Sequence, residues 1–231
     1  MQNNINMASE TNTLFPLNDN KIKTVLDLET LKICKYDTQL FKNSTNVTYL
    51  EGETPNVYKY VASLMNNDIG KIKELQMCLG HCLINTQNNC LYVFYGAGSN
   101  GKSSLLKILR KILTESMGKR IAHAVYHEGW NNNCPRAAFL YDVDLNDGCF
   151  SVDDCYDLLQ QTKVIAETNT YPYKILNETT KHKIKVIEFP VKFVADKNRD
   201  SAMVEDMYTV HLSEMFTWIA RGANMWLDEN K

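Results

Sequence analysis

Apolar positions along this chain follow two patterns, and each pattern predicts a different kind of element. Apolar residues spaced three and four apart mark the buried stripe of an amphipathic helix. The stretches with this spacing are residues 56–65, 69–83, 105–113 and 212–227. Short continuous apolar runs mark buried strands, and they occupy residues 91–95, 137–141 and 191–195. Pro55 is a start signal for the first helix, and Gly118 is a stop signal for the third.

Weaker patterns fill the remaining stretches. Residues 1–13 are polar and rich in Asn, so we expect a disordered tail. Residues 14–50 hold short alternating pieces between polar turns, which predicts extended or small hairpin structure. Further expectations are a strand at 120–125, a helix at 152–161 capped by Ser151, and a β-hairpin at 164–188 with its polar tip at 177–183. We divide the chain into the tail, an accessory region at 14–88 that ends in helices, and a core at 89–231.

The loop after the strand at 91–95 carries the most specific chemistry. It fits the pattern G-x-x-x-x-G-K-[ST] and stands between a strand and a helix, the context that distinguishes a phosphate-binding loop from a chance glycine-rich turn. Glycines expose backbone N–H groups to phosphate oxygens, and the helix directs its positive end at the same anion. We expect ATP and Mg²⁺ to bind at Gly96, Ala97, Gly98, Ser99, Asn100, Gly101, Lys102, Ser103 and Ser104.

Two residues of this loop have individual roles. Lys102 would reach the β and γ phosphates from a solvated position at the mouth of the loop, supplying charge rather than packing. Ser103 would hold Mg²⁺ through its hydroxyl. The motif is a strong signal for nucleotide binding and says little about which reaction follows.

The apolar run at 137–141 ends in Asp142-Val143-Asp144. In phosphate-loop ATPases, an apolar strand that ends in acids holds Mg²⁺ and polarises water. Asp142 and Asp144 suit that work, with Asp142 also expected as a Mg²⁺ ligand. A strand end with solvated acids is the alternative interpretation.

A basic cluster lies at the tip of the expected hairpin. It consists of Lys181, His182 and Lys183, and Lys174 and Lys185 are near it in the sequence. The cluster suits a finger that contacts nucleic acid, and it suits equally a sheet edge that lysines protect from pairing.

Composition limits the function classes. The chain has 231 residues, 44% of them hydrophobic, and a formal net charge of -2. That length suits one domain with an appendage or two small domains. A near-neutral charge means that any nucleic-acid contact must come from a local patch.

Location and redox state are also expectations from sequence. No apolar run is long enough to span a bilayer, so we expect no association with a membrane. The N-terminus lacks the apolar core of a signal peptide, so we expect an intracellular protein. The seven cysteines are then reduced thiols. Cys78, His81 and Cys82 lack a second ligand pair at matching spacing, so we interpret them as buried helix residues rather than a zinc site.

The order of these motifs resembles the superfamily 3 helicases, and within them the helicase part of the poxvirus and giant-virus helicase-primases and related phage proteins. The resemblance rests on GAGSNGKSS in the phosphate loop, ELQMCLGHCLINTQNN before it, FPVKFVADKN as the strand with the family's sensor Asn, and FTWIARGANMWL as the closing helix. It covers most of the chain, from about residue 14 to residue 227.

The resemblance implies an AAA+-like α/β core that acts as a hexameric ring. It implies that Asp142, alone or together with Asp144, stands at the catalytic carboxylate position, where the family more often has Glu. Asn198 would be the sensor of the γ-phosphate, and Lys181, His182 and Lys183 would track single-stranded DNA in the ring channel. The partners implied are single-stranded or forked DNA, further copies of the chain and replication proteins, in host cytoplasm or nucleus if the protein is viral.

Two departures from the family pattern matter. The chain has no room for a primase domain. The family carries an arginine after the sensor, in a segment that leads to a hydrophobic strand, and the matching segment at 203–210 has Glu205 and Asp206 instead. Arg199 and Arg221 are the only arginines after Ala195. An acid at that place predicts slow hydrolysis, while the intact phosphate loop predicts that Mg-ATP still binds well.

Two functions therefore stay open at the level of sequence. One is a nucleic-acid-dependent ATPase, a viral replicative helicase or a shortened relative. The other is a catalytically weakened nucleotide-binding subunit of a ring or scaffold. Phosphate-loop kinases fit less well, because the segments at 164–188 and 191–198 have no role there.

Overall fold

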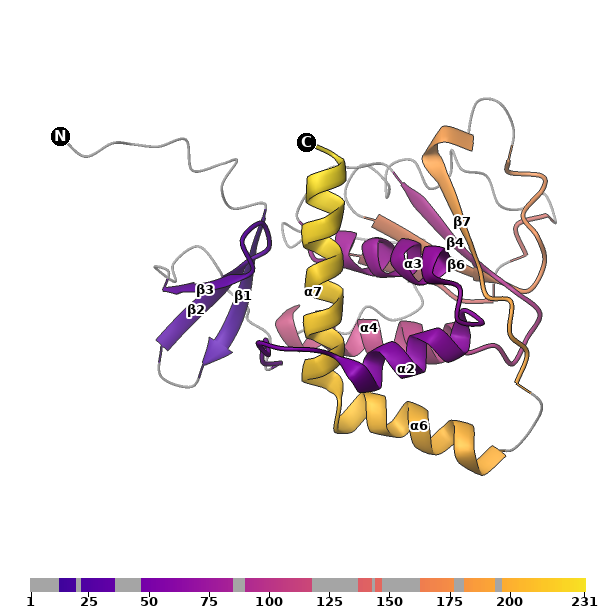
Figure 1. Cartoon of the computed structure of the whole chain (residues 1–231). Helices are drawn as coiled ribbons and strands as arrows, with labels where there is room; N and C mark the ends of the chain where they lie inside the picture. Colours follow the sequence, from indigo (N-terminus) through magenta and orange to yellow (C-terminus); the bar gives the residue numbers. More distant parts are fainter. Residues whose placement is uncertain are drawn as a thin grey trace.

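The computed structural model describes residues 13–19, 22–35, 47–84, 90–117, 137–142, 144–146, 163–176, 181–193 and 197–231. The N-terminal part is a three-stranded antiparallel meander of β1 (Leu14–Asp19), β2 (Ile22–Asp27) and β3 (Lys32–Lys35). This confirms the extended structure expected for the part of residues 14–50 that is described. Figure 1 shows the meander beside the C-terminal helix α7 (Leu212–Glu229), away from the larger sheet.

Most of the expected helices are present close to their expected ends. They are α2 (Pro55–Leu64), α3 (Ile69–His81), α4 (Lys102–Met117) and α7. Pro55 occupies the first turn of α2, where a missing N–H does no harm. Asp68 caps α3 by accepting a hydrogen bond from the backbone N–H of Lys71 at 3.1 Å.

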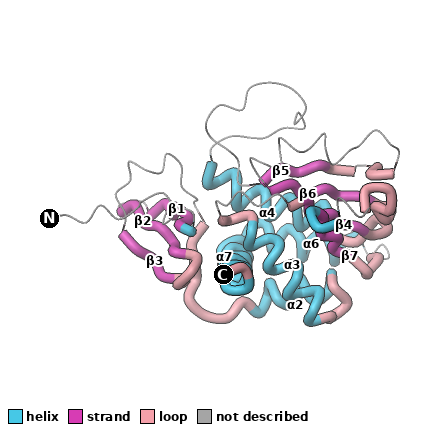
Figure 2. Tube along the Cα trace, turned by 90° about the horizontal axis from the view of Figure 1, so that it is seen from above, coloured by secondary structure: helices cyan, strands magenta, loops and turns pink. Residues whose placement is uncertain are grey.

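The larger sheet has four strands in the order β5-β6-β4-β7, and every pair in it is parallel. Its strands are β4 (Leu91–Tyr95), β5 (Ala137–Leu140), β6 (Lys163–Thr168) and β7 (Ile184–Glu188). With its helices and the closing α7, this sheet is the α/β, phosphate-loop NTPase-like core that the sequence predicted. Figure 2 shows α7 between the meander and the larger sheet.

The predicted hairpin at 164–188 is wrong. β6 and β7 lie on opposite sides of β4, and both run parallel to it, so they do not pair with each other. The alternating pattern was real, but alternation only reports that a strand has two faces and cannot report which strand is its neighbour. Residues Lys181–Lys183 form a short 3₁₀ helix, η3, that leads into β7, rather than a hairpin tip.

The predicted strand at 191–195 is also wrong where it is described. Residues 191–193 are not a strand, and the chain is helical again from Lys197 in α6 (Lys197–Thr209). The segment instead crosses the phosphate loop, with the N–H of Phe193 donating to the carbonyl of Ser99 at 2.8 Å. Phe193 is an apolar residue of this run because it packs against the main hydrophobic cluster.

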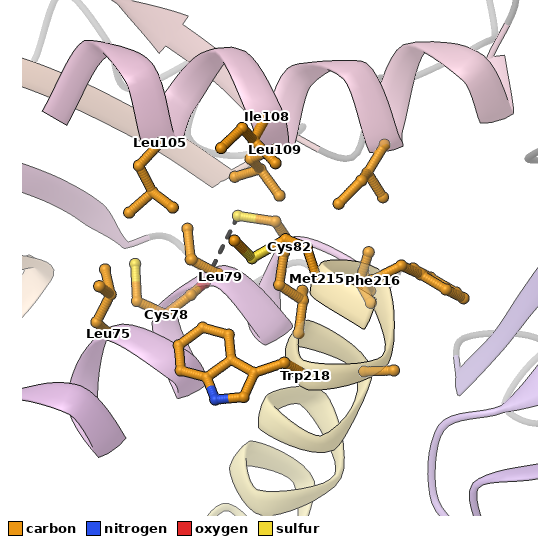
Figure 3. Packing of buried hydrophobic residues seen from close by; sticks show 14 of the residues in the cluster. Leu75, Cys78, Leu79, Cys82, Leu105, Ile108, Leu109, Met215, Phe216 and Trp218 are labelled. Atoms are coloured by element: carbon orange, nitrogen blue, oxygen red, sulfur yellow. Dashed lines mark hydrogen bonds between the residues drawn. The ribbon is translucent and has the colours of Figure 1, made fainter. Parts of the chain in front are cut away.

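The core lies on both faces of the sheet because alternate residues of each strand point to opposite sides. On one side, Tyr92 and Phe94 join the cluster formed with α2, α3, α4 and α7. On the other side, Leu91 and Val93 join a smaller cluster with residues of β5 and β6. Figure 3 shows α4 packed over α3 and α7 through Leu105, Leu109, Leu79, Met215 and Phe216.

The boundary drawn between residues 88 and 89 stays a prediction about domains. In the packing, α2 and α3 from before it share one hydrophobic cluster with α4 and α7 from after it. The aromatic pair Phe15–Phe216, with ring centroids 5.3 Å apart, brings β1 into the same cluster.

Three expectations lie outside the described residues: the tail at 1–12, the strand at 120–125 and the helix at 152–161. Within the described part of the chain, no helix is both long enough and apolar enough to cross a membrane.

Candidate functional site

The carboxyl ends of β4, β5 and β6 lie at the same end of the sheet because all three strands run in the same direction. The loop after each strand therefore projects into the same space. The resulting pocket has a volume of about 430 Å³ and is lined by Gly98, Ser99, Asn100, Gly101, Lys102, Ser103, Ser104, Tyr141, Asp142, Glu167 and Asn169. Most of the predicted nucleotide-binding residues thus line one concave site.

The phosphate loop takes a backbone path that requires its glycines. Gly101 has a φ of 86°, and a Cβ there would stand 2.5 Å from Cδ2 of Leu64 at the end of α2. A Cβ on Gly96 would stand 2.6 Å from the carbonyl oxygen of Phe189. Gly98 faces open space, with only Asn169 Oδ1 nearby at 3.9 Å, so its backbone is accessible to a ligand. Ala97 is exposed.

Lys102 is buried rather than solvated, which corrects the expectation from sequence. Its side chain is folded into the site and is 2% exposed. The ammonium group donates to the carbonyl of Gly96 at 2.6 Å, to Asn100 Oδ1 at 3.0 Å and to Asn169 Oδ1 at 3.2 Å. Burial lowers the pKa of Lys102, and the carboxylates of Glu167 and Asp142 oppose that shift.

Glu167 is a site residue that the sequence analysis missed. The hydroxyl of Ser103 donates to Glu167 Oε1 at 2.5 Å, while Glu167 Oε2 is buried without a hydrogen-bond partner. Unpaired buried carboxylate oxygens are costly, so this atom is where an additional ligand would be stabilised. The signal was present in the sequence, because the apolar run of β6 is followed by an acid near the end of the strand, but the hairpin interpretation assigned this acid no role.

Asn169 is a second missed residue, two positions further along the same chain segment. Its Oδ1 accepts from Lys102, and its Nδ2 donates to Asp142 Oδ1 at 3.2 Å. One amide thus joins the loop after β4 to the loop after β5. Asp142 itself is exposed and has a φ of 52°, a left-handed conformation that is uncommon outside glycine.

Asp144 contacts the loop after β5 rather than the phosphate loop. It is exposed, and its Oδ1 accepts a hydrogen bond from the backbone N–H of Asn146 at 2.9 Å. It is not among the described residues that line the pocket. The structure therefore brings Asp142 to the phosphate loop together with Glu167, not with Asp144.

Asn198 does not stand at the end of a strand. It belongs to the first turn of α6, and its side chain lies outside the described residues. Asn169, at the end of β6 and in contact with Lys102, is the asparagine that the topology places at the phosphate pocket. The run at 191–195 is therefore not the strand that the resemblance expected before the sensor Asn, and the role given to Asn198 stays a prediction.

The segment at 203–210, which was matched to the arginine segment of the family, is also not where the resemblance expected it. Glu205 and Asp206 lie within α6 and do not lead into a strand of the described sheet. The segment that does lead into the strand after Asn169 is η3, with Lys181, His182 and Lys183. The expectation of slow hydrolysis from acids at 205 and 206 loses its structural basis.

The cluster in η3 lies far from the phosphate pocket along the sheet. Ile184 pairs with Leu91 at the start of β4, whereas the phosphate loop follows the end of β4. Lys181 and His182 are exposed, and Lys183 is half-buried. Arg221 is on α7, where its guanidinium donates to the carbonyl of Gly52.

Within the described residues, no group of three or more His, Cys, Asp or Glu side chains is arranged to hold a metal ion by itself. Cys78 and Cys82 are both buried. A cation at the pocket would therefore need ligands from Ser103, from water or from a bound nucleotide in addition to carboxylates.

No protein-family model and no curated protein sequence matches this chain. Solved structures of the NrS-1 C-terminal region do match in fold. An A-form apo structure has a TM-score of 0.56 at 14% identity, covering 80% of this chain and 52% of that chain. A second A-form apo structure has 0.53 at 13%, covering 82% and 54%, and a further apo structure has 0.52 at 11%, covering 96% and 73%.

At these identities the likeness concerns the fold alone. This chain spans about half the length of the first two matched chains. The fold is a parallel α/β core of the phosphate-loop NTPase type with a C-terminal helix, similar to that of the NrS-1 C-terminal region.

Proposed function

We propose that this protein binds Mg-ATP at the phosphate loop and hydrolyses it as a superfamily 3 helicase-like ATPase of viral DNA replication. One observation carries the proposal: Lys102, Ser103, Asp142, Glu167 and Asn169 converge from three strand ends on one pocket. Movement on single-stranded or forked DNA, a homo-oligomeric ring and replication partner proteins belong to the same proposal.

The pocket fits a triphosphate in charge and in backbone geometry. Lys102 supplies a buried cation held by three oxygen acceptors, all of them neutral, so its charge is not cancelled by a direct ion pair. A phosphate oxygen would displace one of these weak acceptors and gain a charge-assisted hydrogen bond. The open backbone at Gly98 and the start of α4 at Lys102 add N–H donors for the same anion.

The Ser103–Glu167 pair fits a magnesium site. Hydroxyl and carboxylate oxygens are the ligands that Mg²⁺ prefers, with water and phosphate oxygens in its remaining positions. Glu167 Oε2, buried without a partner, is available to a water of that shell. When bound, the cation would neutralise charge that develops on the phosphates.

Asp142 is the residue that we assign to orienting the attacking water. It is exposed at the pocket wall, and the amide of Asn169 fixes one of its oxygens. Because the same amide contacts Lys102, Asn169 would register whether a phosphate has displaced it from the ammonium group.

The test is nucleotide binding by four variants of the purified chain. Lys102→Ala and Ser103→Ala should each weaken binding of a fluorescent ATP analogue in the presence of Mg²⁺ by tenfold or more. Lys107→Ala is the matched control, since Lys107 is an exposed lysine on the same helix α4. Glu167→Gln should retain binding and lose most turnover, because the change keeps the shape and removes the charge.

Lys102 is buried, so Lys102→Ala carries a risk of unfolding that Ser103→Ala, at a half-buried hydroxyl, does not share. Circular dichroism and thermal melting of all four variants separate loss of binding from loss of fold. ATP affinity that is unchanged in a folded Ser103→Ala and a folded Lys102→Ala would refute the proposal.

The second candidate is a nucleotide-binding ring or scaffold subunit with weakened catalysis. The observation in its favour is that the described residues lining the pocket include no arginine, and that the basic side chains in η3, just before β7, are lysine and histidine. Arginine neutralises a planar phosphoryl group with two parallel hydrogen bonds, and lysine does so only as a point charge. Strong ATP binding with negligible turnover in the presence of single-stranded DNA would favour this candidate.

A further inference from the structure

The loop that follows Asn169 carries two of the exposed aromatic side chains of the described chain. Tyr171 is 51% exposed and Tyr173 is 65% exposed, with a buried Pro172 between them. A single exposed ring is common on a protein surface, but two exposed rings on the short loop that follows the pocket residue Asn169 form a candidate binding surface. Neither ring lines the pocket itself.

The backbone beneath these rings is held in place. The side-chain amide of Asn146 donates to the carbonyl of Tyr171 at 2.9 Å and accepts from the N–H of Lys174 at 3.2 Å. The N–H of Tyr173 donates to the carbonyl of Tyr171 at 2.9 Å. Tyr171 also rests edge-on against Tyr95, with ring centroids 5.4 Å apart. The rings are therefore presented on an ordered loop, which lowers the entropy lost on binding.

We propose that Tyr171 and Tyr173 form a stacking surface for the bases of single-stranded nucleic acid, beside the phosphate pocket. The inference rests on the proposed function for its biological setting. Bases stack on aromatic rings without sequence preference because every base has a π-face. Lys174, exposed and next in the chain, is placed to contact a backbone phosphate.

The character of the surface favours nucleic acid over a protein partner. Its exposed large apolar side chains are both tyrosines, whereas the exposed aliphatic residues Ile33, Leu50, Ile69 and Val210 lie on other elements. Asp142 and Asp144 are exposed close by in the fold, so the local charge is not strongly basic. Stacking, rather than phosphate attraction, must then supply most of the affinity.

The loop also offers a direct connection to the nucleotide. Asn169 contacts Lys102 and Asp142, and Tyr171 is only two residues further along the chain. Single-stranded DNA that shifts the two tyrosines on binding would also move Asn169. A nucleotide that displaces Asn169 from Lys102 would in turn move the tyrosines. Such coupling is reciprocal, so Mg-ATP and single-stranded DNA should each change the affinity of the other by the same factor.

The experiment measures binding of a fluorescent oligothymidylate of about 20 nucleotides by anisotropy, with and without Mg-ATP. Alanine substitution of one stacking residue weakens binding by about 5- to 150-fold. The double variant Tyr171→Ala/Tyr173→Ala should therefore lose about 30-fold or more. Tyr171→Phe/Tyr173→Phe keeps the rings and should stay within about threefold of the wild type.

Tyr58→Ala is the matched control, because Tyr58 is a tyrosine on α2 that is 49% exposed. It should leave the affinity unchanged. The loss in the double alanine variant should be similar at about 50 and 200 mM salt, since stacking does not release counterions.

Equal affinity of the wild type and the double alanine variant would overturn the inference. So would a change in oligomeric mass, measured by sedimentation, without a change in DNA affinity, because that result identifies a protein interface. A wild type that binds Mg-ATP but no single-stranded DNA overturns the inference and leaves the nucleotide site intact. A wild type that binds DNA through the tyrosines but no ATP supports the inference and refutes the proposed nucleotide site.

Discussion

Helices α3 and α7 cross so closely that two glycines are required at the contact, and this closeness makes Gly80→Ala a sharp test of the fold. A Cβ on Gly80 would stand 2.1 Å from the backbone nitrogen of Ala223 and 2.2 Å from the carbonyl carbon of Gly222. A Cβ on Gly222 would stand 2.0 Å from the carbonyl oxygen of Gln76. The contacts are with backbone atoms, which have no rotamer to change.

The size of the effect follows from these distances. Nonbonded carbon contacts rest near 3.5 Å or beyond, so the two helices would have to separate by roughly 1.5 Å at the crossing. Overpacking of this kind costs about 3 kcal/mol or more when the neighbour cannot move aside. Alanine regains up to about 1 kcal/mol of helix propensity relative to glycine. We therefore expect Gly80→Ala to reduce the free energy of unfolding by at least about 2 kcal/mol.

Urea unfolding followed by circular dichroism at 222 nm measures this loss. The control is Gly70→Ala on the same helix, where the added Cβ would meet only Asp68 Oδ1, at 3.3 Å. A shift of a few tenths of an ångström in that side chain relieves the contact and keeps its cap on Lys71, so the control should stay within about 1 kcal/mol of the wild type. If Gly80→Ala is no less stable than Gly70→Ala, the close crossing of α3 and α7 does not exist as described.

Two further predictions concern charge. Glu214 accepts hydrogen bonds from the N–H groups of Asn56 and Val57 at the start of α2, where Thr54 makes no side-chain cap. Burial raises its pKa, but hydrogen bonds from Asn56 and Val57 and the nearby His211 outweigh burial and hold the pKa below its ordinary value. The stabilisation from Glu214 is therefore present above the ordinary carboxyl pKa and lost as the pH falls through the lowered pKa. Glu214→Gln should be less stable than the wild type at pH 7, and the difference should disappear once the pH is below the lowered pKa. A stability difference that is constant with pH would contradict this. Changing both Lys181 and Lys183 to Glu should weaken single-stranded DNA binding equally for all sequences and flatten its salt dependence. ATP affinity should be unchanged, because η3 precedes β7 at the end of the sheet opposite the phosphate loop. An unchanged DNA isotherm would favour the alternative interpretation of the cluster as a solvated sheet edge.

The sequence by itself determined the local elements and the phosphate loop. Helical spacing predicted α2, α3, α4 and α7, because a helix buries one face and its period is set by the backbone. The phosphate loop was predictable because its strand, glycines and helix are contiguous, so the chain alone places Lys102 and Ser103 beside one another.

The tertiary structure decided which strand ends share an edge, and with that the rest of the site. An alternating run of residues is the same for a hairpin and for two parallel strands on either side of β4, so the sequence pattern could not exclude the hairpin. Glu167 and Asn169 became site residues only when β6 was found beside β4, since Glu167 and its partner Ser103 are 64 positions apart in the sequence. Lys102 was likewise expected in solvent, because a side chain's burial depends on neighbours that are distant in the sequence, and here Asn169 is one of them.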